Sequence, residues 1–495
     1  MKKILCLLLA ILTLVSVVAC GEAGNDVAGS DSTGKDTEAS TTVQKIDAEP
    51  YDGVFKAGFA RIDVTPKVPI KKKDGSGSYT KVNDSIYLTC VAVNDGENTA
   101  LLLTLDVSSI GASMDRSFKK YITSETGIPA ENIMISATHT HTAPAPGFPT
   151  NDSVATRWLV SLNNSMADAA KEAIADLADA EIYNGTTVVK GMAFVRRGYA
   201  EDGEPIGIWR GRSTADMVKY ESEADNSVQI LRFVREDKKD IVMANLQTHF
   251  TEAGEYLDSA ISADIADTLR VVVEMQDEDA LFGVYVGASG NINTKAYVKS
   301  TKKFGSYQKM AKTVAEKIVA ATPDLKKVEA GKIQTTAKVV TTNVRKDDAD
   351  TIAKAQAAAA EIKALKKYDG DAEVYAIAKK YGFESAKEVT STVSRNTNYG
   401  PTRDHTIGAI SFGDIAFVSA PYEMFDTNGM EIKQGSPYDM TFVLTNAGGA
   451  GAYVPSALAV PNGGYEVYTA VDEFGTAERM VSEFLSMLKE HKGIS

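Results

Sequence analysis

Short apolar runs and longer amphipathic stretches alternate along the chain from about residue 55 onward, a pattern typical of a domain that mixes strands and helices. Runs rich in β-branched and aromatic side chains predict strands at Phe55–Val64, Ile86–Val93, Ala100–Asp106, Ile133–Ala137, Ser227–Val234, Ile241–His249, Phe282–Val286, Ile333–Val344, Thr406–Phe412, Ile415–Ala420 and Thr441–Leu444. Apolar positions at helical spacing predict helices at Trp158–Ala178, Tyr307–Ala321, Asp348–Lys367, Ala372–Tyr381 and Thr476–Glu490.

Tight turn signals join several of the predicted strands. Residues 95–98, 235–239 and 412–414 each read as the turn of a hairpin. Hairpins favour antiparallel or mixed sheets over a doubly wound parallel sheet. We therefore predict a layered α/β domain of the α+β type over residues 51–495, with mainly antiparallel or mixed β-sheets at its centre and helices outside.

Residues 347–390 form a block rich in Ala, Lys, Glu and Asp between two predicted strands. No residue of this block suggests chemistry, so we favour a helical insertion on the surface of the domain. A lid over the functional site is the alternative.

The first twenty residues have the pattern of an export signal. Lys2 and Lys3 precede an apolar run that is too short to span a bilayer and that ends in Ala19 and Cys20. This junction resembles a bacterial lipobox, which implies a lipid on Cys20 and a lipoprotein of the bacterial cell membrane that faces away from the cytoplasm. An ordinary signal peptide with an incidental cysteine is the alternative. Residues 21–50 have the composition of a disordered tether.

Charge and cysteine content narrow the function classes. A net charge of −13 with no basic block argues against a nucleic-acid partner. Apart from Cys6 and Cys20, the remaining cysteine of the sequence is Cys90, which lies in a predicted strand and is expected to be a buried small hydrophobe.

The chain has five histidines, and three of them follow predicted strands. His139 and His141 continue the strand at Ile133–Ala137, so we expect them to point to one face of that strand. One could bind a metal while the other meets a substrate, or both could bind the metal. His405 is expected in a loop without a role, and His491 on a solvated helix face.

Further potential ligands follow other strands. His249 ends one predicted strand, Glu423 comes just after another, and Tyr453 follows a glycine-rich segment after a third. Two histidines, a carboxylate and another oxygen donor would suit Zn²⁺ with an open position for water. The spacing does not show that these residues meet.

The segment Ile135–Pro144 resembles the Ser-Ala-Thr-His-Thr-His-Ser-x-Pro signature of the neutral/alkaline (non-lysosomal) ceramidases. Other short segments resemble the same family in the same order, over about residues 52–490. These segments are Ala57–Pro66, Leu105–Val107, Val195–Arg197, Gly290–Thr294, Pro421–Glu423 and Gly451–Pro455.

The resemblance implies the helix–sheet–sheet–helix catalytic domain of that family, without its C-terminal β-sandwich. It implies a zinc ion held by His139, His249, Glu423 and Tyr453. His141, Arg196 and Tyr453 would then be catalytic, with Arg197 as the neighbouring alternative to Arg196. The implied activity is the zinc-dependent hydrolysis of an N-acyl amide by activated water, as in sphingolipid metabolism.

The chain departs from the family pattern at several positions. Asn291 stands where the family has Asp, Asn293 where it often has Ser, and Thr294 where it has Pro. Tyr422 replaces a glycine, and we expect it to narrow the entrance of the site. These changes keep two alternatives open: a metal-dependent hydrolase of another amide or an ester, and a non-catalytic lipoprotein that binds a ligand.

Overall fold

The computed structural model describes residues 53–72, 77–146, 152–208, 213–257, 259–299, 301, 303–365 and 372–494. They belong to one compact unit, residues 45–495. The predicted signal, the Cys20 lipidation site and the 21–50 tether lie outside the described residues.

Nine of the described strands form a mixed sheet. Its strands in spatial order are β16 (Ala280–Val286), β14 (Asp240–Leu246), β13 (Ser227–Arg235), β8 (Ala178–Val188), β1 (Lys56–Asp63), β5 (Tyr87–Asn94), β6 (Thr99–Leu105) and β7 (Ile133–Ala137), with β18 (Lys326–Val328) beside β8. Pairing is antiparallel except between β14 and β16 and between β6 and β7.

A second sheet has the order β19 (Gln334–Asn343), β20 (Thr402–Phe412), β21 (Ile415–Ser419) and β23 (Met440–Leu444). Its pairs are antiparallel except β21 with β23. The hairpins predicted at residues 95–98, 235–239 and 412–414 are all present.

The two sheets pack face to face, because alternate residues of each point into a shared apolar layer. Phe233, Leu102 and Tyr285 contribute from the first sheet, and Phe417 and Phe442 from the second. This apolar layer is covered by one sheet on each side and forms the centre of the domain.

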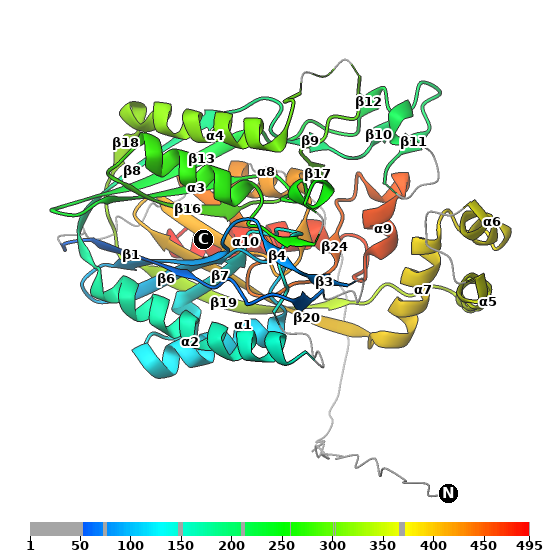
Figure 1. Ribbon diagram of the computed structural model, residues 1–495, viewed down its shortest axis with the longest axis horizontal. Helices are drawn as coiled ribbons and strands as arrows, with labels where there is room; N and C mark the ends of the chain where they lie inside the picture. Colours follow the sequence, from blue (N-terminus) through cyan, green and yellow to red (C-terminus); the bar gives the residue numbers. More distant parts are fainter. Residues whose placement is uncertain are drawn as a thin grey trace, which may run out of the picture. The chain divides into compact units, whose positions relative to one another are not determined.

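Helices cover the outer face of each sheet (Figure 1). The larger sheet packs against α1 (Ala112–Thr126), α2 (Ser153–Ala175), α3 (Ile265–Gln276) and α4 (Tyr307–Ala321). The smaller sheet packs against α8 (Asp426–Gly435) and α10 (Thr476–His491). The predicted α+β fold with central mixed sheets and outer helices is therefore confirmed. None of the described helices is both long and apolar enough to cross a membrane.

The 347–390 block folds as helices, but it is not a simple hairpin. Helices α5 (Ala349–Leu365), α6 (Ala372–Lys380) and α7 (Ala386–Asn398) share a small apolar core of their own. They connect β19 to β20, and their base is closed where Val344 N donates to Pro401 O at 2.8 Å. The short helix α9 (Tyr465–Thr469) packs beside α7, with Tyr468 Oη donating to Glu384 Oε2 at 2.9 Å.

The remaining elements are short. They are β2 (Ile70–Lys71), β3 (Ser78–Tyr79), β4 (Lys81–Val82), β9 (Phe194–Val195), β10 (Gly198–Tyr199), β11 (Pro205–Ile206), β12 (Lys219–Tyr220), β15 (Ala260–Ile261), β17 (Ile292–Asn293), β22 (Glu423–Met424), β24 (Tyr453–Val454) and five 3₁₀ turns, η1 (Ala130–Asn132), η2 (Thr214–Asp216), η3 (Ala253–Glu255), η4 (Thr322–Asp324) and η5 (Val460–Asn462). Several of them build the walls of the candidate site.

Candidate metal centre and active site

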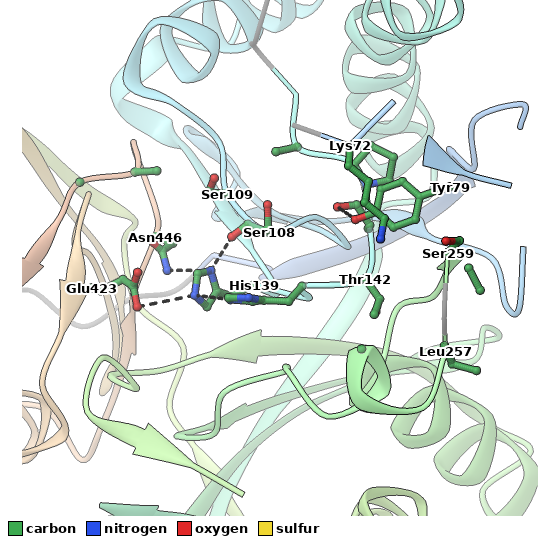
Figure 2. A pocket seen from close by; sticks show the side chains of 18 residues that line it. Lys72, Tyr79, Ser108, Ser109, His139, Thr142, Leu257, Ser259, Glu423 and Asn446 are labelled. Carbon is green, nitrogen blue, oxygen red and sulfur yellow. Dashed lines mark hydrogen bonds and ion pairs between the residues drawn. The ribbon is translucent and has the colours of Figure 1, made fainter. Parts of the chain in front are cut away.

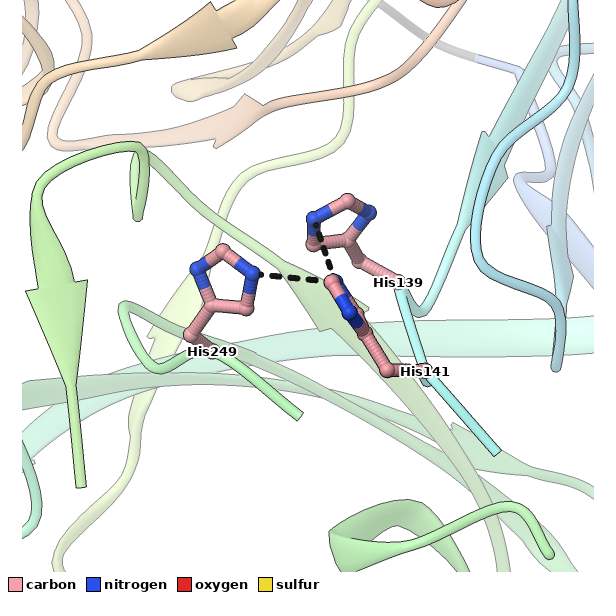
Figure 3. Close-up of side chains that lie close together, drawn as sticks. All are labelled: His139, His141 and His249. Atoms are coloured by element: carbon pink, nitrogen blue, oxygen red, sulfur yellow. Dashed lines mark hydrogen bonds between the residues drawn. The ribbon is translucent and has the colours of Figure 1, made fainter. Parts of the chain in front are cut away.

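His139, His141 and His249 come together at one end of the two sheets (Figure 3). The Nε2 atoms of His139 and His141 lie 3.3 Å apart, and those of His141 and His249 lie 3.2 Å apart. His139 and His249 are buried, whereas His141 is exposed to the solvent of a cavity. The structure thus brings together three histidines that the sequence placed after two different strands.

The histidine pair does not continue strand β7 as predicted. The strand ends at Ala137, and His139 has a left-handed backbone with φ of 62°. The loop is held from its other side, because Thr140 Oγ1 and Thr142 Oγ1 both donate to Ser262 O at 3.0 Å. Anchoring the two threonines keeps both imidazoles turned toward the site. His249 likewise lies beyond its strand, which ends at Leu246.

Hydrogen bonds fix which imidazole nitrogens are free to act as ligands. His139 Nδ1 faces the backbone oxygen of Ser108, and His249 Nδ1 lies 3.3 Å from Ser289 O. Each Nδ1 can only donate to its carbonyl, so the lone pair of each neutral ring is on Nε2. Carbonyl oxygens in this position are the usual second partners of metal-binding histidines.

Glu423 is the carboxylate that completes this group (Figure 2). Its Oε2 lies 3.6 Å from His139 Nε2 and is buried without a hydrogen-bond partner among the described residues. A buried carboxylate oxygen without a donor is costly unless a cation meets it. Burial alone would raise the pKa of Glu423, but His139 and then Arg196 outweigh it and hold the pKa below its usual range. The carboxylate is therefore ionised.

Tyr453 is placed next to Glu423 by strand pairing, because β22 and β24 form a parallel ladder in which these two residues are partners. Gly290 allows β22 to approach closely: a Cβ there would lie 2.8 Å from Glu423 O. Burial, and then the Glu423 charge, raise the pKa of Tyr453 well above its ordinary value. The surrounding protein groups therefore keep Tyr453 as a neutral phenol.

Arg196, rather than Arg197, is the arginine that faces the site. Its guanidinium lies 5.5 Å from the ring centre of Tyr453, and it donates to Gly290 O and to Glu466 Oε1, both at 2.7 Å. Arg197 instead pairs with Glu221 and with Glu466 Oε2. Burial opposes the charge of Arg196, but Tyr453, Glu466 and Glu423 outweigh it and raise its pKa. Its positive charge is therefore permanent.

The imidazoles of His249 and His141 are neutral. Burial and then His139 lower the pKa of His249 well below its ordinary value. The His141 ring is enclosed by protein yet opens onto the cavity, and this desolvation together with His139 also lowers its pKa. Neutral imidazoles can bind a metal ion or accept a proton. The donor set of imidazole nitrogens, a carboxylate and a phenol fits Zn²⁺, and the unpartnered Glu423 oxygen is what a cation would satisfy.

A cavity of about 700 Å³ opens onto this centre, a size within the usual range of small-molecule sites. Its residues come mainly from the loops around the two sheets (Figure 2). They include Ser108, Ser109, His139, His141, Glu423 and Asn446 at one end and Lys72, Tyr79, Leu257 and Ser259 at the other.

Other residues occupy places that the sequence did not indicate. Tyr422 is 1% exposed and packs edge-on against His405, so it does not narrow the entrance as predicted. His405 lies within β20, where its Nε2 is 3.1 Å from Asp472 Oδ1. His491 is buried, with its two ring nitrogens 2.9 Å from hydroxyls of Thr336 and Ser411. Both histidines are structural because their strands and helix face the interior.

The altered loop at residues 290–294 is also structural. Asn291 Nδ2 donates to Asp426 Oδ1 at 2.6 Å, and its Oδ1 accepts from Asp426 N at 2.9 Å. Asn293 Nδ2 donates to Tyr297 Oη at 3.0 Å. Asn291 holds the loop against α8, Asn293 ties it to Tyr297, and neither side chain lines the cavity.

Sequence reasoning missed Asn446 and Glu466. Asn446 Nδ2 lies 3.3 Å from His139 Nδ1, and the loop that carries it runs along β7, with Ala137 N donating to Asn446 O. Asn446 lies two residues after the buried strand β23, and this position at a strand end could have marked it as a candidate site residue. Glu466, fully buried between two arginines, follows no strand and left no signal.

Two solved structures resemble this chain over most of its length. A neutral ceramidase from Pseudomonas aeruginosa matches with a TM-score of 0.63 and 12% sequence identity, covering 89% of this chain and 75% of the other. A ceramidase complexed with C2 matches with a TM-score of 0.65 and 13% identity, covering 90% and 76%.

The chain has the neutral ceramidase fold. The predicted resemblance is thus confirmed at the level of the fold. A comparison of the sequence with protein-family models and with curated proteins finds no match.

Proposed function

We propose that this protein is a zinc-dependent hydrolase of the N-acyl amide bond, with a ceramide-like lipid as the leading class of substrate. The observation that carries the proposal is the convergence of the His139, His141 and His249 Nε2 atoms with the unpartnered oxygen of Glu423 at the end of an open cavity. The fold shared with ceramidases supports an amide as the target.

In this proposal His139, His249, Glu423 and Tyr453 hold the ion. Zn²⁺ in such a site supplies Lewis acidity and makes water a nucleophile near neutral pH. The Ser108 and Ser289 carbonyls keep the two imidazoles in the ligating tautomer, and the parallel pairing of β22 with β24 keeps the carboxylate beside the phenol.

His141 is the proton carrier of the reaction. Of the three histidines it is the most exposed, it lines the cavity, and its neutral ring can accept a proton. His141 takes a proton from the attacking water as the C–O bond forms. It then returns that proton to the amide nitrogen as the C–N bond breaks, which leaves a carboxylic acid and an amine.

Arg196 and Tyr453 oppose the negative charge that develops on the carbonyl oxygen. The permanent cation of Arg196 lies behind the Tyr453 ring and strengthens its hydroxyl as a donor. Because Glu466 and Gly290 O hold the guanidinium, this charge is oriented before the substrate binds.

Metal analysis and turnover of the purified full chain test the proposal together. We expect near-stoichiometric zinc by elemental mass spectrometry, lost in His139→Ala and Glu423→Ala but kept in the control His491→Gln. We also expect hydrolysis of a fluorogenic N-acyl amide, with kcat reduced about 10²- to 10⁴-fold in His141→Ala while zinc is retained. Turnover that survives the loss of His139 would refute the proposed centre.

A panel of ceramide, short acyl amides and esters in the same assay separates the amide proposal from an esterase.

We further propose that Cys20 carries a lipid and anchors the protein to the bacterial membrane, outside the cytoplasm. The sequence around Cys20 supports this proposal. Incorporation of a labelled fatty acid into the wild type but not into Cys20→Ala tests it.

A further inference from the structure

The cavity has a chemical asymmetry that the proposed reaction does not use. Glu423 is the only carboxylate among its described lining residues, and it belongs to the proposed metal centre. At the end away from Glu423, the cavity is lined by Lys72 and Tyr79 (Figure 2).

Lys72 is held at the cavity by the hairpin of β2 and β3. Its backbone N–H donates to Gly77 O at 2.9 Å, and its Nζ lies 5.3 Å from the ring centre of Tyr79. Among the described residues, no carboxylate forms an ion pair with Lys72. In a chain with a net charge of −13, a half-buried lysine that pairs with no described carboxylate can attract an anionic group of a ligand.

The wall around Lys72 is otherwise apolar or weakly polar. Leu257 lies at this end with Tyr79 (Figure 2), and Ala143, Pro144 and Ala260 are further apolar residues of the cavity lining. An alkyl segment fits such a wall, while the ammonium group requires a charged partner. The combination favours an amphiphilic ligand over a neutral lipid.

We propose that the substrate of this site is an anionic N-acyl amide, whose carboxylate or comparable acidic group binds Lys72 while the scissile amide lies at the histidine cluster. This inference rests on the proposed hydrolysis of an N-acyl amide, and it replaces a neutral ceramide-like lipid by an anionic substrate class. Lys72 acts here as a specificity-determining residue that binds substrate away from the reacting atoms.

Matched substrates test the proposal on the purified full chain. N-lauroyl ω-amino acids with one, three or five methylene groups are compared with the N-lauroyl ω-amino alcohols of the same length. We expect kcat/KM to favour at least one amino acid derivative over its alcohol by about tenfold, mainly through KM. Lys72→Ala should reduce the ratio of kcat/KM between the two series to near one, and Lys72→Arg should restore most of the preference.

Lys71→Ala is the matched control, because Lys71 is the adjacent exposed lysine and does not line the cavity. Equal use of both series by the wild type, or equal effects of Lys71→Ala and Lys72→Ala, would overturn the proposal while leaving amide hydrolysis intact. Affinity measured by calorimetry separates the two proposals. Binding of the amino acids that depends on Lys72, without any turnover, would refute the hydrolase and support the anionic ligand class.

Discussion

Glu423 and Tyr453 are direct partners in the parallel ladder of β22 and β24. Each strand has only two residues, so the ladder serves mainly to set these side chains next to each other and beside Arg196. The ionised carboxylate, the neutral phenol and the permanent cation form one electrostatic unit. A change in one member is therefore expected to alter the other two.

Tyr453→Phe removes the hydroxyl and keeps the ring. This ring packs edge-on against Tyr465, with 5.4 Å between the two ring centres. We expect kcat for an N-acyl amide to fall about 10²-fold or more, because a donor beside the developing charge is lost. The thermal midpoint should change little. Tyr468→Phe is the control, since that hydroxyl bonds to Glu384 instead. Similar kinetics for the two variants would contradict a role of Tyr453 in the reaction.

Glu466 holds two arginines at once, and its pKa is lowered by Arg196 and Arg197 against the effect of burial. Glu466→Gln removes the carboxylate to which both buried guanidinium groups donate, and it leaves Arg197 with Glu221 as its remaining ion-pair partner. We expect the free energy of unfolding to fall by roughly 3–5 kcal/mol in urea denaturation. Glu221→Gln, which of the two arginines affects only Arg197 and also changes the acceptor of Asn462 Nδ2, should cost clearly less. Equal losses would show that the Glu466 carboxylate is not the main partner.

Burial raises the pKa of Asp426 to about 7, despite the hydrogen bond from Asn291. A folded-state pKa above the unfolded value means that the folded protein keeps a proton which the unfolded chain releases, so stability is lost as the pH rises toward and through 7. Asp426→Asn cannot titrate. Between pH 5 and pH 8 the unfolding free energy of the wild type should fall by roughly 2–3 kcal/mol more than that of the variant. Parallel pH profiles would refute the raised pKa.

Tyr422 is a core residue, and its substitution should act on stability. Tyr422→Ala is expected to cost roughly 3–5 kcal/mol in unfolding free energy, because it leaves a cavity against His405 and the strands around it. The ratio of rates for long and short acyl amides should stay the same, since Tyr422 does not line the cavity. A changed ratio in Tyr422→Phe, which preserves the packing, would contradict this placement.

Strongly patterned elements could be predicted from the sequence. The strand Ile133–Ala137 and the helix Tyr307–Ala321 have the predicted bounds because their apolar periods are undisturbed. Strand β8 was missed: Ala178–Val188 is largely polar and half-exposed, yet it joins β13 to β1. Helix α3 was missed as well, because its run of valines resembles a strand.

The sequence indicated several residues that the structure brings together, but it did not indicate their geometry. Strand ends pointed to His139, His249 and Glu423, while the left-handed backbone at His139 and the β22–β24 ladder depend on contacts between distant segments. His405 and His491 were misplaced for the same reason. Their burial is decided by the partners Asp472, Thr336 and Ser411, which no local pattern indicates.

The helices α5–α7 have a consequence for engineering. They enter and leave the domain through adjoining backbone positions, joined by the Val344–Pro401 hydrogen bond, and they bury their apolar side chains against one another. Connections whose two ends already meet tolerate changes in length at little entropic cost. This part of the chain is therefore a suitable insertion site. A reporter domain whose termini lie close together could replace the helices while the strand register of β19 and β20 is kept.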